Sequence, residues 1–255
     1  MSVIALLTDF GYKDGFVGAV KGVIKSINKD AETVDISHGI ASFNILEGAL
    51  VLNAVYRYFP EKTIFMCVVD PGVGTERKPI AVETEKYYFV APDNGILTLA
   101  LKNEKIRAIC HINNEKYLLE RNTETFHGRD IFAPTVAYIS KGVRLSELGE
   151  MLNDYLKLDF PEVRRENGYV VGRIVMFDKF GNGITNISSL PEEFGEITVK
   201  NLKIKKICRN FLEGDKNSLN LIKGSFGFYE IFVPQKSAKD MFNLNVGDEI
   251  KIKLE

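Results

Sequence analysis

Apolar runs alternate with helix-like patterns over the first 70 residues. Three short runs, Val3–Thr8, Glu32–Ile36 and Thr63–Val69, are typical of strands, and the first and third are apolar enough to be buried. Between them, apolar residues recur at helical spacing in the segments Asp14–Ile27 and Asn44–Phe59, whose first residues are suitable N-caps. This order predicts an α/β fold with a mostly parallel N-terminal sheet and helices on both of its faces.

Shorter elements follow in the rest of the first half. Strand-like runs occur at Ile80–Thr84, Tyr87–Val90 and Ile106–Ile112, the first two joined by a short polar turn. Helices are predicted at Gly95–Leu101 and Asp130–Ser140.

The character of the chain changes after residue 156. Residues 157–168 are polar and are predicted to form a linker. Beyond them helix signals nearly vanish, and short apolar runs are separated by turn residues. We therefore predict an N-terminal α/β domain over residues 1–156 and a smaller, antiparallel β-barrel-like C-terminal domain over residues 169–255. The predicted strands of the second domain are Val170–Phe177, Ile184–Ile187, Ile197–Val199, Leu202–Ile207, Phe228–Val233 and Glu249–Leu254.

Composition and charge exclude several classes of partner. The 255 residues carry a net charge of −1, so the chain has no overall field to hold nucleic acid or an anionic membrane. No stretch approaches the roughly 20 apolar residues that span a bilayer, and the N-terminus does not resemble a signal peptide. The three cysteines are widely spaced and odd in number, which suits a reducing compartment. A cytoplasmic protein is expected.

Polar residues follow three successive predicted strands. Asp9 follows the first, Ser37 and His38 follow the second, and Asp70 follows the third. Ligands bind outside the carboxyl ends of strands in an open α/β sheet, so this edge is the predicted binding site. Neither a G-x-G-x-x-G dinucleotide loop nor a phosphate loop is present, which favours a neutral diol such as ribose as the partner of Asp9.

Asp70, Arg77 and His127 are the candidate catalytic residues. Together a carboxylate, a guanidinium and an imidazole can polarise a water molecule, and neither segment contains a nucleophilic Ser or Cys beside them. Phe126, next to His127, can stack on a flat ring. The alternatives are a structural histidine on a loop and a solvated arginine.

A second polar segment lies in the C-terminal half. Asp178, Phe180 and Asn182 fall within five residues and can bind an ammonium group, a ring face and an adenine edge, respectively. The alternative is an ordinary hairpin turn, since Asn-Gly is a strong turn signal.

These segments together resemble the S-adenosyl-L-methionine (SAM) hydroxide adenosyltransferases, or SAM hydrolases, which are related to the fluorinating and chlorinating SAM enzymes. The matching segments are Leu7–Gly11, Asp35–His38, Val69–Thr75, Ala91–Gly95, Thr125–Asp130 and Phe177–Asn182.

The resemblance implies cleavage of SAM into adenosine and L-methionine by a water-derived nucleophile, without a metal or other cofactor. It also implies a homotrimer with sites at the subunit interfaces. The family's catalytic triad falls on Asp70, Arg77 and His127. Substrate-binding roles fall on Asp9 for ribose, Asp178 for methionine and Asn182 for adenine, with Phe126, Phe180, Ser225 and Phe228 as further substrate-binding residues.

Two alternative functions come from other classes of protein. One is a non-catalytic sensor that holds adenosine or SAM. The other is a metal-dependent phosphoesterase, although no closely spaced pair of ligands supports a metal site.

Overall fold

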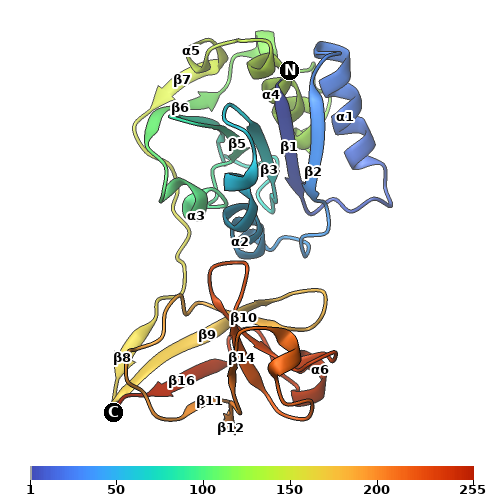
Figure 1. Ribbon diagram of the computed structural model, residues 1–255. Coiled ribbons are helices and arrows are strands. Elements are labelled where there is room, and N and C mark those ends of the chain that lie inside the picture. Colours follow the sequence, from blue (N-terminus) through green and yellow to red (C-terminus); the bar gives the residue numbers. More distant parts are fainter. Residues whose placement is uncertain (1) are drawn as a thin grey trace. The chain divides into compact units, whose positions relative to one another are not determined.

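The computed structural model describes residues 2–255, which fold as two compact units comprising residues up to Leu158 and residues 159–255 (Figure 1). Each unit has its own sheet and hydrophobic core.

The N-terminal unit is built on a seven-stranded sheet in the order β2-β1-β3-β5-β4-β6-β7. The strands are β1 (Val3–Thr8), β2 (Glu32–Ser37), β3 (Ile64–Val68), β4 (Pro79–Thr84), β5 (Tyr88–Pro92), β6 (Ile106–Ile112) and β7 (Gly149–Leu152).

The expectation of a mostly parallel sheet is wrong. β1 pairs in parallel with β2 and β3, and β3 with β5, but β4 pairs antiparallel with β5 and β6, and β6 with β7. The sheet is therefore mixed. The physical reason is the short connection between β4 and β5, because a parallel pair needs a long crossover whereas a tight turn joins only antiparallel strands.

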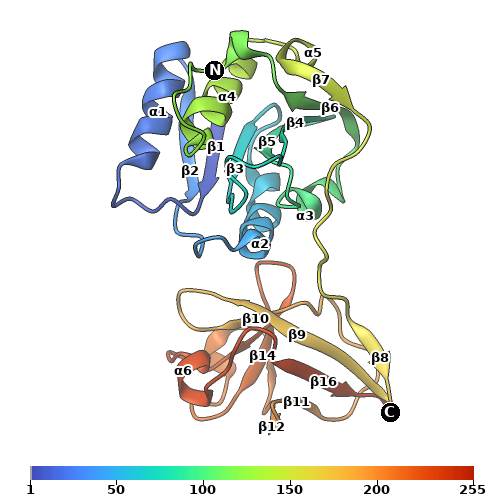
Figure 2. The ribbon, with the colours of Figure 1, turned by 180° about the vertical axis from the view of Figure 1, so that it is seen from behind.

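Helices cover both faces of this sheet, as the sequence predicted (Figures 1 and 2). Successive residues of β1 point to opposite faces, so Ile4 packs with α1 and α4 while Ala5 packs with α2 and α3. The helices are α1 (Phe16–Ile27), α2 (Ile45–Val55), α3 (Thr98–Leu101), α4 (Ala133–Ser140) and α5 (Leu145–Leu148), with 3₁₀ turns η1 (Tyr56–Tyr58) and η2 (Glu115–Tyr117) and a π-helical turn η3 (Gly128–Phe132).

The two predicted N-caps have different outcomes. Asn44 caps α2 as predicted, since its side chain accepts a hydrogen bond from the backbone N–H of Glu47 at 3.1 Å. Asp14 does not cap α1. That helix begins one residue later than a cap at Asp14 requires, because Gly15 takes the N-cap position in a left-handed conformation with φ 75°.

The C-terminal unit is a curled sheet in the order β12-β11-β16-β9-β10-β15-β14-β13, with β8 paired to β9 (Figure 1). Its ladders are antiparallel except for the β13–β14 pair. The elements are β8 (Arg164–Glu166), β9 (Tyr169–Phe177), β10 (Gly183–Thr185), β11 (Ile197–Val199), β12 (Leu202–Lys203), β13 (Ile207–Cys208), η4 (Phe211–Glu213), β14 (Asn220–Lys223), β15 (Tyr229–Phe232), α6 (Ala238–Phe242) and β16 (Glu249–Lys253).

The edges of this sheet explain its curvature. β12 and β13 are the two ends of the strand order, yet they follow one another in the chain across Ile204–Lys206. Such a short link cannot cross a flat sheet of this width, so the sheet must curl toward a half-barrel. Ile204 N donates to Ile197 O in β11, and Lys205 N donates to Leu219 O just before β14. These two hydrogen bonds connect the link to both ends of the strand order.

Other elements differ from those that the sequence predicted. Strand β8 lies within residues 157–168, which were expected to be a linker. The expected strand Leu202–Ile207 is instead divided into β12 and β13, and α5, β7, β14 and α6 were not predicted. Among residues 2–255, no helix is both long and apolar enough to cross a membrane.

We expect Asn44→Ala to lower the free energy of unfolding by about 0.5–2 kcal/mol, because the substitution leaves the N-terminal N–H groups of α2 without a side-chain acceptor. Denaturant titration at fixed protein concentration measures this loss. Asn103→Ala is the matched control, since Asn103 makes only a long, exposed bond of 3.4 Å to Leu99 O. Equal stability of the Asn44 variant and the wild type would contradict a stabilising cap.

Candidate active site

A cavity of about 310 Å³ lies at the carboxyl ends of β1 and β3. These strands are adjacent and parallel, so Asp9 and Asp70, which closely follow them, face the same edge. Both carboxylates line the cavity together with His127. The other lining residues are Phe10, Asp14, Phe16, Ser42, Phe43, Val68, Val73, Thr125, Phe126 and Gly128.

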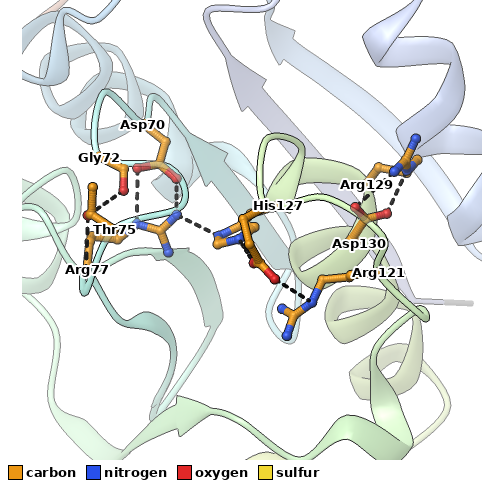
Figure 3. Close-up of polar contacts among 9 residues, drawn as sticks. Asp70, Gly72, Thr75, Arg77, Arg121, His127, Arg129 and Asp130 are labelled. Carbon is orange, nitrogen blue, oxygen red and sulfur yellow. Dashed lines mark hydrogen bonds and ion pairs between the residues drawn. The ribbon is translucent and has the colours of Figure 1, made fainter.

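Asp70, Arg77 and His127 form one hydrogen-bonded chain (Figure 3). Arg77 lies between the other two: its Nε donates to Asp70 Oδ1 at 3.1 Å, its Nη2 bonds Asp70 Oδ2, and the same Nη2 lies 3.0 Å from His127 Nδ1. The side chains of Arg77 and Asp70 are 7% and 6% exposed. This buried, two-bonded pair excludes the alternative of a solvated arginine.

The loop from Asp70 to Arg77 folds back on itself to form this chain. Thr75 Oγ1 donates to Gly72 O at 2.7 Å and accepts from Arg77 N at 3.3 Å. Gly74 has φ 77°, and a Cβ there would lie 2.9 Å from Glu124 O. A glycine is therefore required where this loop meets the segment before His127.

The second ring nitrogen of His127 is also occupied. Nε2 lies 2.9 Å from Glu124 Oε2, and Glu124 in turn lies 3.8 Å from Arg121 Nε. An arginine can only donate, so Nδ1 of His127 accepts from Arg77 and Nε2–H donates to Glu124. This tautomer leaves neither ring nitrogen free to take a proton from water. The interaction with His127, followed by the charge of Arg121, lowers the pKa of Glu124.

Burial and the neighbouring arginine act in opposite directions on the pKa of Asp70. Burial raises the pKa of its carboxyl, and the charge and hydrogen bonds of Arg77 oppose that shift. Arg77 also stacks over the buried ring of Phe132 in η3, with its Cζ 5.5 Å from the ring centroid. The guanidinium is therefore fixed behind the cavity wall.

Asp9 and Phe126 also line the cavity. Asp9 Oδ2 accepts the backbone N–H of Phe43 at 2.9 Å. Phe126 packs edge-on against Phe10 and Phe16, with ring centroids 5.8 and 5.1 Å apart. A Cβ at Gly128 would lie 2.8 Å from the Phe10 ring, so this glycine lets the aromatic wall close against η3.

His38 does not line the cavity but supports the Asp9 loop. It is buried, with Nδ1 2.7 Å from Thr8 Oγ1 and Nε2 3.2 Å from Asp35 Oδ1. Its carbonyl accepts from Gly11 N at 2.7 Å, and Thr8 Oγ1 accepts from Phe10 N at 3.2 Å. Burial lowers the pKa of His38.

A larger cavity of about 640 Å³ lies in the C-terminal unit. Asp178, Phe180, Asn182 and Ser225 all line it, so four of the five residues predicted in this half are near one another. Phe228 is not among the lining residues; its ring lies 5.9 Å from that of Phe160.

The turn between β9 and β10 is held by Asp178. Its Oδ1 accepts from the backbone N–H groups of Phe180 and Asn182 at 2.9 and 2.8 Å. Its Oδ2 accepts from Asn182 Nδ2 at 2.9 Å, which leaves the amide oxygen of Asn182 for a ligand. The expected turn is therefore present, and the cavity lies beside it.

The family of the chain follows from comparison with known proteins. The family model described as the SAM hydroxide adenosyltransferase N-terminal domain matches residues 4–149, and the model for the C-terminal domain matches residues 172–251. The chain belongs to this family.

Three similar proteins illustrate the relationship. An (R)-S-adenosyl-L-methionine hydrolase from Methanocaldococcus jannaschii is 37% identical over 99% of this chain and 96% of its own. A fluorinase from Actinoplanes sp. (strain N902-109) is 27% identical over 72% of this chain and 71% of its own. A crystal structure of an uncharacterised conserved protein from Thermotoga maritima is 37% identical, with a TM-score of 0.89 over 98% of this chain and 99% of that one.

Sequence reasoning missed Glu124, Phe226 and Glu230. Glu124 precedes His127 by three residues, a spacing that places both on one turn and was a usable signal. Phe226 lines the C-terminal cavity one residue from Ser225. Glu230 is a lone carboxylate in an otherwise apolar strand and is buried beside that cavity, an arrangement that only the structure reveals.

We expect Arg77→Met to lower the free energy of unfolding by about 3–5 kcal/mol at neutral pH, because it leaves the Asp70 carboxylate buried and unpaired. The unpaired carboxyl has a raised pKa, so the loss should be larger near pH 8 than near pH 5, where Asp70 can bind a proton in the folded state.

The double variant Asp70→Asn with Arg77→Met should recover most of this stability, since no charge is then buried. Arg121→Met is the control, because Arg121 is only part of a 3.8 Å pair with an exposed partner. Denaturant titrations at both pH values measure all four proteins. If the double variant is no more stable than Arg77→Met, the unpaired carboxylate is not the cause.

Proposed function

We propose that this protein hydrolyses SAM to adenosine and L-methionine. The observation that carries the proposal is the buried chain of Asp70, Arg77 and His127 on the wall of a cavity that also contains Asp9. Membership of the SAM hydroxide adenosyltransferase family and the similarity to proteins named (R)-S-adenosyl-L-methionine hydrolase support it.

The proposed reaction is a displacement at the ribose C5′. The oxygen of a water molecule forms a bond to C5′ while the C5′–S bond breaks, and the electron pair leaves with sulfur as the neutral thioether of methionine. The water loses one proton to the protein. Because a hydroxide-like nucleophile and a sulfonium neutralise one another, a dry aromatic cavity favours the step.

Asp70 is the proposed acceptor of the water proton. Both ring nitrogens of His127 are occupied, by Arg77 and Glu124, whereas Asp70 lines the cavity. The raised pKa of Asp70 makes it a stronger base than an ordinary carboxylate. Arg77 and His127 then orient this carboxylate, and Asp9 is assigned to the ribose hydroxyls.

The same carboxylate selects water over a halide. A negatively charged Asp70 on the cavity wall repels an anionic nucleophile. The proposed reaction needs no metal or other cofactor, and a chelator should leave turnover unchanged.

The assembly we propose is a homotrimer whose sites combine cavities from two subunits. The cavity with Asp9, Asp70 and His127 belongs to one unit of the chain, and the cavity with Asp178 and Asn182 belongs to the other. A heterologous contact between unlike surfaces closes into a ring under threefold symmetry. A cytoplasmic location is proposed from the three free, buried cysteines.

We expect the wild-type protein to release methionine and adenosine from SAM in equal amounts. Asp70→Asn should lower turnover by about 10²–10⁴-fold because it removes the proposed proton acceptor, and His127→Ala should lower turnover strongly because the Asp70–Arg77 pair loses a positioning contact. Product chromatography measures both. His111→Ala is the control, since His111 lies on β6 outside the cavity. Absence of methionine release by the wild type would contradict the function, and wild-type turnover in both variants would contradict the assignment of the triad.

We expect a mixture of inactive His127→Ala and Asp178→Ala proteins to regain activity after dissociation and reassociation. If each site takes its two cavities from neighbouring subunits, random exchange of equal amounts yields about one intact site in four. Native mass spectrometry confirms that subunits have exchanged. Exchange without recovered activity would mean that each chain forms its own site.

A further inference from the structure

Glu230 is a buried carboxylate that the proposed reaction does not yet use. It lies on β15, is 5% exposed and lines the 640 Å³ cavity together with Asp178 and Asn182. Its Oε1 lies against the backbone of Gly224, where a Cβ would overlap it. Within residues 2–255, no hydrogen bond or ion pair reaches its side chain.

The positive groups near the cavity do not neutralise Glu230. Lys223 Nζ bonds the carbonyl of Ser188 and, at 2.6 Å, that of Gly227. Lys236 Nζ lies 3.2 Å from both Lys216 O and Asn217 Oδ1. Both ammonium groups are therefore committed to other acceptors, although both residues line the cavity.

Burial, and then the negative charge of Asp178, raises the pKa of Glu230 to about 7. Near neutral pH the carboxyl is thus divided between its two protonation states. A buried carboxylate without a donor is costly, and a cation between it and Asp178 removes both the desolvation cost and the repulsion.

Asp178 by itself has a different role. Its oxygens already accept three hydrogen bonds from the turn that it holds, so it supplies negative charge at a fixed point. Glu230 supplies oxygens that no protein donor occupies. Two carboxylates at one cavity suit a primary ammonium group, which has three donors and one positive charge.

We propose that Glu230, together with Asp178, binds the α-ammonium group of the methionine part of the substrate. This assignment rests on the proposed function and adds a specificity-determining residue to it. The neutral amino group of adenine is the less suitable ligand, because it would not relieve the repulsion between the two carboxylates. A divalent metal is also less suitable, since no group of three or more His, Cys, Asp or Glu ligands occurs among residues 2–255.

The main test compares Glu230→Gln with the wild type in the full chain, using SAM and a SAM analogue that lacks the α-amino group. We expect the variant to raise KM for SAM by about tenfold or more, the effect of losing a charged hydrogen bond, and to leave KM for the analogue within about twofold. Adenosine affinity, measured by calorimetry, should not change. Glu196→Gln is the matched control, because Glu196 is exposed in the same unit and paired with Lys203 at 3.6 Å.

A second measurement separates charge recognition from a structural role. Methionine affinity should rise from about pH 6 to pH 8 as Glu230 ionises, since the ammonium group stays charged over this range. Binding near pH 7 should release protons, visible as a dependence of the heat on the buffer. Glu230→Gln should abolish both effects. Equal losses for SAM and the analogue, or a loss of adenosine affinity, would overturn the assignment.

The outcomes also distinguish this assignment from the proposed function. A wild-type protein that does not cleave SAM but binds methionine with the expected pH dependence would retain the ammonium site and reject hydrolysis. A protein that cleaves SAM equally well with Gln at position 230 would retain hydrolysis and reject the ammonium site.

Discussion

The candidate active site depends on the buried ion pair between Arg77 and Asp70. The two oppositely charged side chains are both more than nine-tenths buried, and each compensates part of the desolvation of the other through two hydrogen bonds, while Nη1 of Arg77 has no hydrogen-bond partner among residues 2–255. The guanidinium uses two nitrogens on the carboxylate and shares one of them with His127, which sets the tautomer of the imidazole and leaves its other nitrogen to Glu124. The hydrogen bonds that each of these groups makes are thus set by its neighbours.

This arrangement assigns a different role to each of the three residues that the sequence indicated only as one catalytic group. The carboxylate faces the cavity, the guanidinium lies behind it over Phe132, and the imidazole joins the pair to the segment around Glu124. Around them, Phe10, Phe16 and Phe126 pack edge to face and form an aromatic part of the cavity wall. An aromatic surface beside the Asp70 carboxylate suits a reaction in which charge disappears as the transition state forms.

The C-terminal unit places polar groups by a different constraint. The two edge strands of its sheet are neighbours in the chain, so the sheet must curl around a core that includes Leu221 and Ile231. The 640 Å³ cavity is lined by Ile222 and Glu230, which point to the opposite face of β14 and β15. The turn held by Asp178 and the strand that carries Glu230 contribute to the same wall. Glu230 is tolerated there without a protein partner, which is the feature that indicates a missing positive charge.

The sequence by itself determined six of the seven strands and the binding edge of the N-terminal sheet, but not β7. Continuous apolar runs predicted β1 and β3, and the polar residues after them predicted the cavity at their ends, because parallel neighbours end at one edge. The motif-like segments around Asp70, His127 and Asp178 were sufficient to indicate the family, since their order along the chain is specific even though each is weak alone.

The short polar turn after Thr84 already indicated that β4 and β5 are antiparallel, although the apolar periodicity, which is the same in parallel and antiparallel strands, did not. Only the tertiary structure decided the hydrogen-bond pattern around His127. The contacts of His127 join residues up to 50 positions apart, and the role of Glu230 depends on the absence of a donor in three dimensions. Hydrogen-bond partners and unpaired charges depend on which side chains the fold buries beside one another. No local pattern along the sequence shows which side chains these are.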